Sequence, residues 1–158
     1  MIINTPKNVS SRNDSRLFEI LKAAHQNARE FFSEVDISSA HPVATGYVGN
    51  VPKVIMVLPP VHMPEPDPQV VALAQDMLQS YGCDHVVFFY PVQLEPSDPD
   101  GTVDHGVVVE VQAKGQASIK RLLQLKGRAN GKNELSAALP VLGKGFGVYY
   151  PNLMDQVV

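Results

Sequence analysis

Two uninterrupted apolar runs, separated by a clearly delimited helix, constrain the fold of this chain more than any other feature. The runs lie at residues 54–58 and 86–90, the second within a strand at 85–90, and strands that are apolar on both sides are typical of the middle of an α/β sheet. Asp67 and Pro68 have the residue types of a helix N-cap and first helical position, and Gly82 suits the residue after a helix. The segment therefore predicts a helix from Pro68 to just before Gly82, within a right-handed β-α-β unit whose strands pair in parallel.

An amphipathic helix is predicted ahead of this unit. Apolar residues recur at intervals of three and four over residues 17–35, and Asn13 or Asp14 suits the N-cap. Residues 1–12 are polar and are expected to be flexible. We therefore expect one α/β domain over residues 13–158, a common length for a single domain.

The remaining strands are predicted to be antiparallel. A hairpin is expected across Gly49–Asn50, and the alternation in residues 107–114 is typical of a half-exposed strand. Residues 117–126 fit a helix or a strand, and the hairpin signal at Asn130–Gly131 favours the strand, with a last strand at 146–150. The predicted class is α/β on the border with α+β: a mixed sheet with one β-α-β unit, an N-terminal helix and a C-terminal antiparallel meander.

Composition is that of an ordinary globular domain. Hydrophobic residues make up 44% of the chain and charged residues 18%, which excludes a disordered protein. The single cysteine, Cys83, excludes an internal disulfide, and no apolar stretch approaches the roughly 20 residues of a membrane span. We therefore expect a cytoplasmic protein that does not engage a membrane.

Two proline-rich loops follow the two strands of the predicted β-α-β unit. They span residues 59–68 and 91–101 and are expected at one sheet edge, where open α/β sheets bind ligands. Imidazole and carboxylate groups there suit a divalent metal, the one cofactor that the sequence suggests. The alternative is a solvated acidic rim, since no tight spacing such as His-x-x-x-His is present. The candidate metal ligands are His62, Glu65, Asp104 and His105.

A second pattern faintly resembles a nuclease motif, in which an acid is followed by Glu-x-Lys on a strand. In that chemistry two carboxylates hold Mg²⁺ and a lysine positions the attacking water. Gln112 stands where the motif has its lysine, so an exposed polar strand face is the alternative interpretation. The candidate catalytic residues are Asp104, His105, Glu110 and Lys114.

Five basic residues, uninterrupted by any acid, occupy residues 120–132. On a hairpin they would contact phosphates and bind nucleic acid in a strongly salt-dependent way. The segment lacks interleaved aromatic residues for base stacking, and the whole chain has a net charge of −3. A solvated basic surface is therefore favoured over nucleic-acid binding. The residues are Lys120, Arg121, Lys126, Arg128 and Lys132.

The function that we favour from the sequence is a small non-enzymatic binding or accessory protein. It would recognise a protein partner or a small ligand through the proline-rich edge, and the alternative is a divalent-metal-dependent phosphodiesterase or nuclease. A further pair, Asp84 and His85, opens the strand at 85–90 and is expected at the opposite edge, where Asp84 either orients His85 or ends the turn after Gly82. Exposed strands in the C-terminal meander also predict a homodimer.

Overall fold

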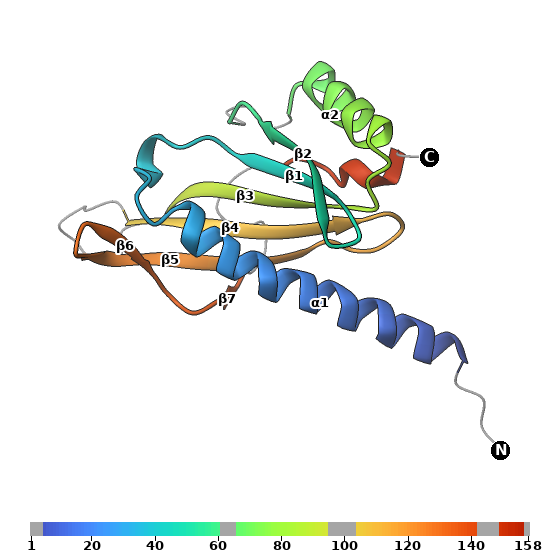
Figure 1. Cartoon of the computed structure of the whole chain (residues 1–158), viewed down its shortest axis with the longest axis horizontal. Coiled ribbons are helices and arrows are strands. Elements are labelled where there is room, and N and C mark those ends of the chain that lie inside the picture. The colour runs from blue at the N-terminus through green and yellow to red at the C-terminus, as the bar shows by residue number, and fades with distance from the viewer. Residues whose placement is uncertain (1–4, 61–65, 95–103, 142–148, 157–158) are drawn as a thin grey trace.

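An antiparallel sheet forms the centre of the computed structural model, which describes residues 5–60, 66–94, 104–141 and 149–156 (Figure 1). The helices are α1 (Thr5–Phe31) and α2 (Pro68–Ser80), with 3₁₀ turns η1 (Ile37–Ser39) and η2 (Leu153–Gln156). The strands are β1 (Val43–Val48), β2 (Val51–Val57), β3 (His85–Leu94), β4 (Asp104–Ala113), β5 (Ile119–Ala129), β6 (Lys132–Leu135) and β7 (Leu139–Pro140).

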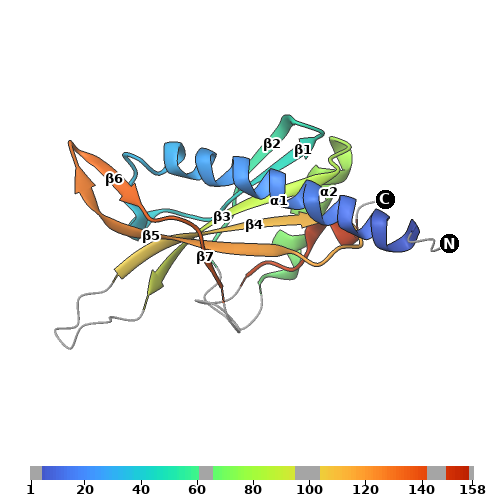
Figure 2. The same cartoon turned by 90° about the horizontal axis from the view of Figure 1, so that it is seen from below.

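The sheet lies between two helical layers, so the described part of the chain is α+β. Hydrogen-bonded strands follow the order β2-β1-β3-β4-β5-β6, and β7 pairs with β5. Helix α1 covers one face, and α2 covers the other together with the segment at 149–156 (Figure 2). Two hydrophobic cores result, one on each side of the sheet. We refer to these sides as the α1 face and the α2 face.

The predicted parallel pairing is wrong, because β1 lies between the two apolar runs. Ala44 of β1 pairs with Met56 of β2 on one side and with Phe88 of β3 on the other, antiparallel in both cases. Strands β2 and β3 therefore run in the same direction without being neighbours. A short hairpin through Gly49, at φ 59°, forms from local contacts, whereas a parallel neighbour needs a long crossover. The first strand of the hairpin thus occupies the place predicted for a parallel partner.

Both helices form for the reasons expected from the sequence, although α1 begins earlier in the chain than predicted. In α2 the Asp67 carboxylate accepts a hydrogen bond from the Gln69 N–H at 2.9 Å, and Gly82 has φ 65°. Helix α1 buries one side, from Leu17 to Phe32, but it begins at Thr5 instead of at a cap near residues 13–14. At 1.5 Å per residue it is about 40 Å long, and its N-terminal part extends beyond the sheet (Figure 1).

Strand β4 is buried on both sides, so the prediction of a half-exposed strand is wrong. Val107, Val109 and Val111 pack on the α1 face, while Glu110 and Gln112 are buried on the α2 face. The central position of β4 in the sheet and the cover provided by residues 149–156 explain this burial.

Strands β5 and β6, at one edge of the sheet, largely follow the expectations from the sequence. Strand β5 confirms the choice of a strand for residues 117–126, and Asn130 and Gly131 adopt positive φ in the turn to β6. Residues 142–148 lie outside the described part of the chain, so the predicted strand at 146–150 is described only at Tyr149 and Tyr150, which are not in a strand.

Candidate functional site

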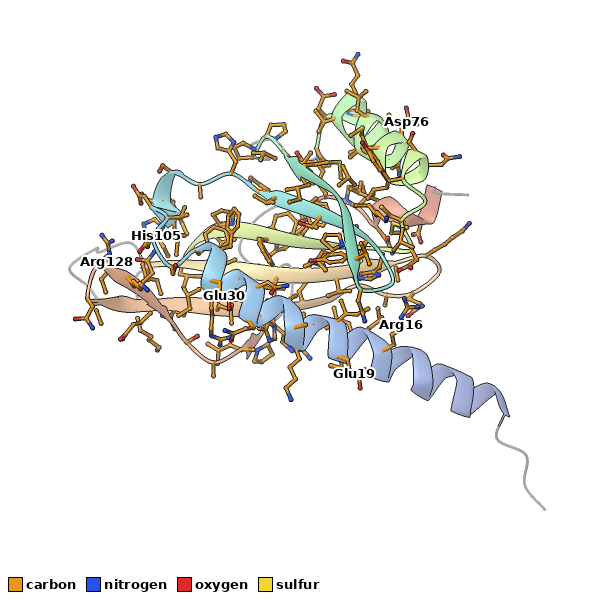
Figure 3. The ribbon with its side chains drawn as sticks, viewed as in Figure 1. Arg16, Glu19, Glu30, Asp76, His105 and Arg128 are labelled. Atoms are coloured by element: carbon orange, nitrogen blue, oxygen red, sulfur yellow. The ribbon has the colours of Figure 1, made fainter. Side chains whose placement is uncertain are left out.

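The predicted metal ligands are described only in part. His62 and Glu65 lie outside the described residues, whereas Asp104 and His105 begin β4 at one end of the sheet (Figure 3). Hydrogen bonds from Ser38 lower the pKa of Asp36, and the charge of His105 adds a smaller contribution. Within the described residues, no cluster of three or more His, Cys, Asp or Glu side chains is arranged to hold a metal ion. The metal site at the proline-rich edge therefore stays a prediction.

The candidate catalytic residues do not come together. Glu110 is 1% exposed in the middle of β4, whereas Lys114 lies exposed in the turn that follows β4. The lysine that meets Glu110 is Lys120, which faces it across β4 and β5 with Nζ 3.1 Å from Oε2. This partner depends on the register of two strands, which the sequence spacing does not reveal.

Glu110 belongs to a buried polar network on the α2 face. Its Oε1 accepts hydrogen bonds from the Tyr90 hydroxyl at 2.9 Å and from the Gln112 amide at 3.1 Å. Burial, the Glu110 charge and this hydrogen bond raise the pKa of Tyr90 well above its usual value, so Tyr90 remains a neutral donor. With Lys120 on Oε2, both carboxylate oxygens have partners.

The same network holds the segment at 149–156 against the sheet. The Gln112 amide donates to the Pro151 carbonyl at 3.0 Å, and the Gln112 carbonyl accepts from the Leu153 N–H at 2.9 Å. The Tyr90 hydroxyl in turn accepts a hydrogen bond from the Tyr150 N–H at 3.2 Å. These buried side chains satisfy backbone groups that would otherwise lose their hydrogen bonds to water, which is a structural role.

The five basic residues do not form one surface. Lys120 and Arg121 are consecutive in β5 and point to opposite faces, Lys120 to Glu110 and Arg121 to the ring of Phe18 on α1, 5.8 Å from its centroid. The other three are exposed around the β5–β6 hairpin, whose Arg128 is labelled in Figure 3. They are Lys126, Arg128 and Lys132. A solvated basic surface stays the favoured interpretation of this hairpin, and nucleic-acid binding stays the alternative.

A pocket of about 180 Å³ opens on the α1 face, between α1 and the first residues of β3. Helix α1 forms one wall, β1 and β3 form the floor, and the turn between β1 and β2 closes one end. The lining residues are Ile20, Ala23, Ala24, Asn27, Tyr47, Gly49, Asn50, His85 and Val87. No lysine, arginine, aspartate or glutamate is among them.

The imidazole of His85 is held in a fixed orientation at the base of this pocket. The ring of Tyr47 stacks on it, with centroids 5.1 Å apart and planes 1° from parallel, because the two residues pair across β1 and β3. His85 Nδ1 lies 2.5 Å from the Asp84 carboxylate. An aspartate carboxylate accepts hydrogen bonds, so Nδ1 of His85 is the donor in this contact. Of the two roles expected for Asp84, the structure thus shows the one in which it orients His85.

Asp84 also joins three segments of the chain. Its carboxylate accepts hydrogen bonds from the Gly49 N–H at 2.7 Å and from the guanidinium of Arg16 at 3.3 Å, besides the bond with His85. Figure 3 shows Arg16 on α1 near this end of the sheet. Burial acts to raise the pKa of Asp84, but the hydrogen bonds from Gly49 and His85 and the electrostatic effects of His85 and Arg16 outweigh burial and lower this pKa.

We expect Asp84→Asn to lower the free energy of unfolding by about 1 kcal/mol at pH 7, because a partly exposed carboxylate loses charge-assisted hydrogen bonds. The depressed pKa stabilises the fold above the ordinary aspartate value, and this stabilisation is lost as the pH falls through the folded-state pKa. The difference between wild type and variant should therefore shrink below about pH 4. Urea unfolding of both proteins across this pH range measures the difference in their free energies of unfolding. Asp76→Asn, on the exposed side of α2 (Figure 3), is the matched control, and an equal loss in both variants would contradict the assignment.

The pocket combines an apolar wall with a few hydrogen-bonding side chains. Ile20 and Val87 are apolar, while Asn27, Tyr47 and His85 carry donors and acceptors. Burial raises the pKa of Tyr47, against a smaller opposing effect of its hydrogen bond with Asn27, so the phenol is neutral at physiological pH. The sequence identified the Asp84–His85 pair, but its meeting with Tyr47 and α1 requires the β1–β3 register and was not predicted.

Compared with protein-family models, with curated proteins and with solved structures, the chain matches none. In the part of the chain that the structure describes, no helix has both the length and the apolar character that crossing a membrane requires.

Proposed function

We propose that this chain is a small non-enzymatic binding protein, which holds a neutral molecule of about one ring in the pocket between α1 and the sheet. The observation that carries this proposal is the His85 imidazole, fixed by Asp84 and stacked on Tyr47, at the base of a pocket whose lining contains no lysine, arginine, aspartate or glutamate. Ligand pockets are commonly apolar with a few oriented polar groups.

The size of the pocket limits the ligand. An engineered apolar cavity of about 150 Å³ accommodates benzene, so about 180 Å³ suits one ring with a small substituent. The polar substituent would meet the hydrogen-bonding side chains of Asn27 and His85. A charged ligand is disfavoured, because no lining residue of opposite charge would compensate for its desolvation. Phenol has the required size and polarity and is the probe that we select.

Phenol should perturb the backbone amide NMR signals of Tyr47, Gly49 and Val87, with a Kd of about 1 mM for a ligand of this size. Benzene should bind more weakly because it lacks the hydroxyl, and benzoate because its charge has no partner. Ala23→Phe, which fills the mouth of the pocket, should weaken phenol binding at least about tenfold. Ala72→Phe, on the exposed side of α2, is the matched control. Unchanged pocket signals with all three probes would contradict the proposal.

The alternative, a divalent-metal-dependent phosphodiesterase or nuclease, has less support. Glu110 is enclosed by its hydrogen-bond partners, and Lys114 lies in a turn away from it. Recognition through the proline-rich edge would involve residues 61–65 and 95–103, which lie outside the described part of the chain. Both ideas stay predictions without a specific structural observation in their favour.

A further inference from the structure

The two edges of the sheet differ in how their backbone is protected. At the β6 edge, the Asn133 N–H donates to the Ser33 carbonyl at 2.6 Å, and the Asn133 side chain donates to the carbonyls of Phe32 and Val35. The turn after α1 therefore covers this edge, and the exposed Lys132 and Glu134 add charge to it. Natural sheets commonly protect their edges by such cover and charge. The expected homodimer contact in the C-terminal meander is thus not available at β6.

The β2 edge has no such cover among the described residues. Its only described strand partner is β1, and the side chains of Ile55 and Val57 are 67% and 69% exposed. The residues of this strand that protect an edge, Pro52 and Lys53, both lie near its beginning and leave residues 54–57 without such protection. An apolar edge strand of seven residues is a template for pairing with another strand.

The backbone groups that face outward from β2 follow from the hairpin register. The Leu58 N–H donates to the Pro42 carbonyl at 2.9 Å, so Leu58 directs its backbone groups toward β1. Inward and outward groups alternate in an antiparallel ladder, so Met56 also bonds to β1, and Ile55 and Val57 direct their N–H and C=O groups away from it. The two residues with the most exposed side chains in β2 thus also present unpaired backbone donors and acceptors.

We propose that two copies of this chain associate by antiparallel pairing of β2 with β2, about a twofold axis at Met56. In this register Ile55 of each copy faces Val57 of the other, and each pair exchanges both backbone hydrogen bonds. The two Lys53 residues lie six positions apart along the joined strands, about 20 Å. This separation exceeds the Debye length of about 8 Å at physiological salt, so their like charges do not oppose the pairing.

The contact is expected to be weak and concentration-dependent, because a single strand pair buries less area than a stable interface needs. It is independent of the pocket, since neither Ile55 nor Val57 lines it. A chain that stays monomeric can therefore still bind a ligand in the pocket, and a chain that binds no ligand can still dimerise through β2.

Charge-swapped variants of the full chain test the contact by sedimentation velocity. Wild type should shift from the 17.2 kDa monomer towards twice this mass as its concentration rises to about 1 mM. The double variants Ile55→Lys/Val57→Lys and Ile55→Glu/Val57→Glu should each remain monomeric, because like charges face each other across the pair. Their mixture should associate, because every lysine then faces a glutamate. Leu73→Lys, at an equally exposed site on α2 (65%), should dimerise like wild type.

Two results would overturn the proposal. A wild-type chain that remains monomeric at about 1 mM has no contact of useful strength. A wild-type dimer that persists in both double variants, or a mixture that stays monomeric, shows that β2 does not pair with β2. Circular dichroism spectra and urea unfolding of each variant establish that it is folded, which is expected because both side chains are exposed in the monomer.

Discussion

Replacing Glu110 with alanine should lower the free energy of unfolding by about 3 kcal/mol, because it leaves several buried donors without an acceptor. The Tyr90 hydroxyl and the Gln112 amide both lose Oε1, and Lys120 loses its ion-pair partner. Lys120 is partly exposed and can turn to water, so its contribution to the loss is the smaller one. Urea unfolding measures the change.

The matched control is Glu134→Ala on β6, whose side chain is exposed and whose loss should change stability by less than about 0.5 kcal/mol. Glu110→Gln keeps an acceptor for Tyr90 but not the charge, so it should fall between the two. Equal stabilities of Glu110→Ala and Glu134→Ala would mean that the network contributes nothing to the fold. In that case the burial of a carboxylate in β4 would have no structural explanation.

Phe88→Ala should also be strongly destabilising, by about 3–5 kcal/mol, because it opens a cavity in the core of the α2 face. Phe88 is fully buried, and its ring stacks on Tyr90 at 5.0 Å and on Tyr150 at 5.8 Å between centroids. Thermal and urea unfolding should agree on the loss. Tyr81→Ala, which truncates a half-exposed ring after α2, should cost far less. A similar cost for both variants would contradict the assignment of Phe88 to the core.

Local features of the fold were predictable because their causes are local. The cap at Asp67, the positive φ of Gly82 and the hairpin turn at Asn130–Gly131 each depend on residues within one turn of the chain. The order of strands was not predictable in this way. The apolar run 54–58 was expected to be covered on both sides, but it forms the edge strand β2, where Ile55 and Val57 are 67% and 69% exposed. An apolar run does not specify which strand lies next to it or whether both of its faces are covered.

In the candidate site, too, contacts between residues close in the chain were predictable and contacts between distant residues were not. Adjacent residues such as Asp84 and His85 suggested an oriented imidazole, and the structure has one. The partners that define the sites come from elsewhere in the chain: Tyr47 stacks on His85 across one strand pair, and Lys120 meets Glu110 across another. These contacts depend on β-sheet register, for which Gln112 and its neighbours carry no recognisable signal in a single sequence.

The dependence of β4 on residues 149–156 has a consequence during synthesis. The ribosome adds about 40 residues between Gln112 and Leu153, which takes about 2–8 s at ordinary elongation rates. During this interval the nascent chain contains the buried face of β4 but not the segment that covers it. Helix α2 precedes β4 and can pack on this face earlier, but the part of the core that Tyr150, Leu153 and Met154 complete can close only after these residues have left the exit tunnel.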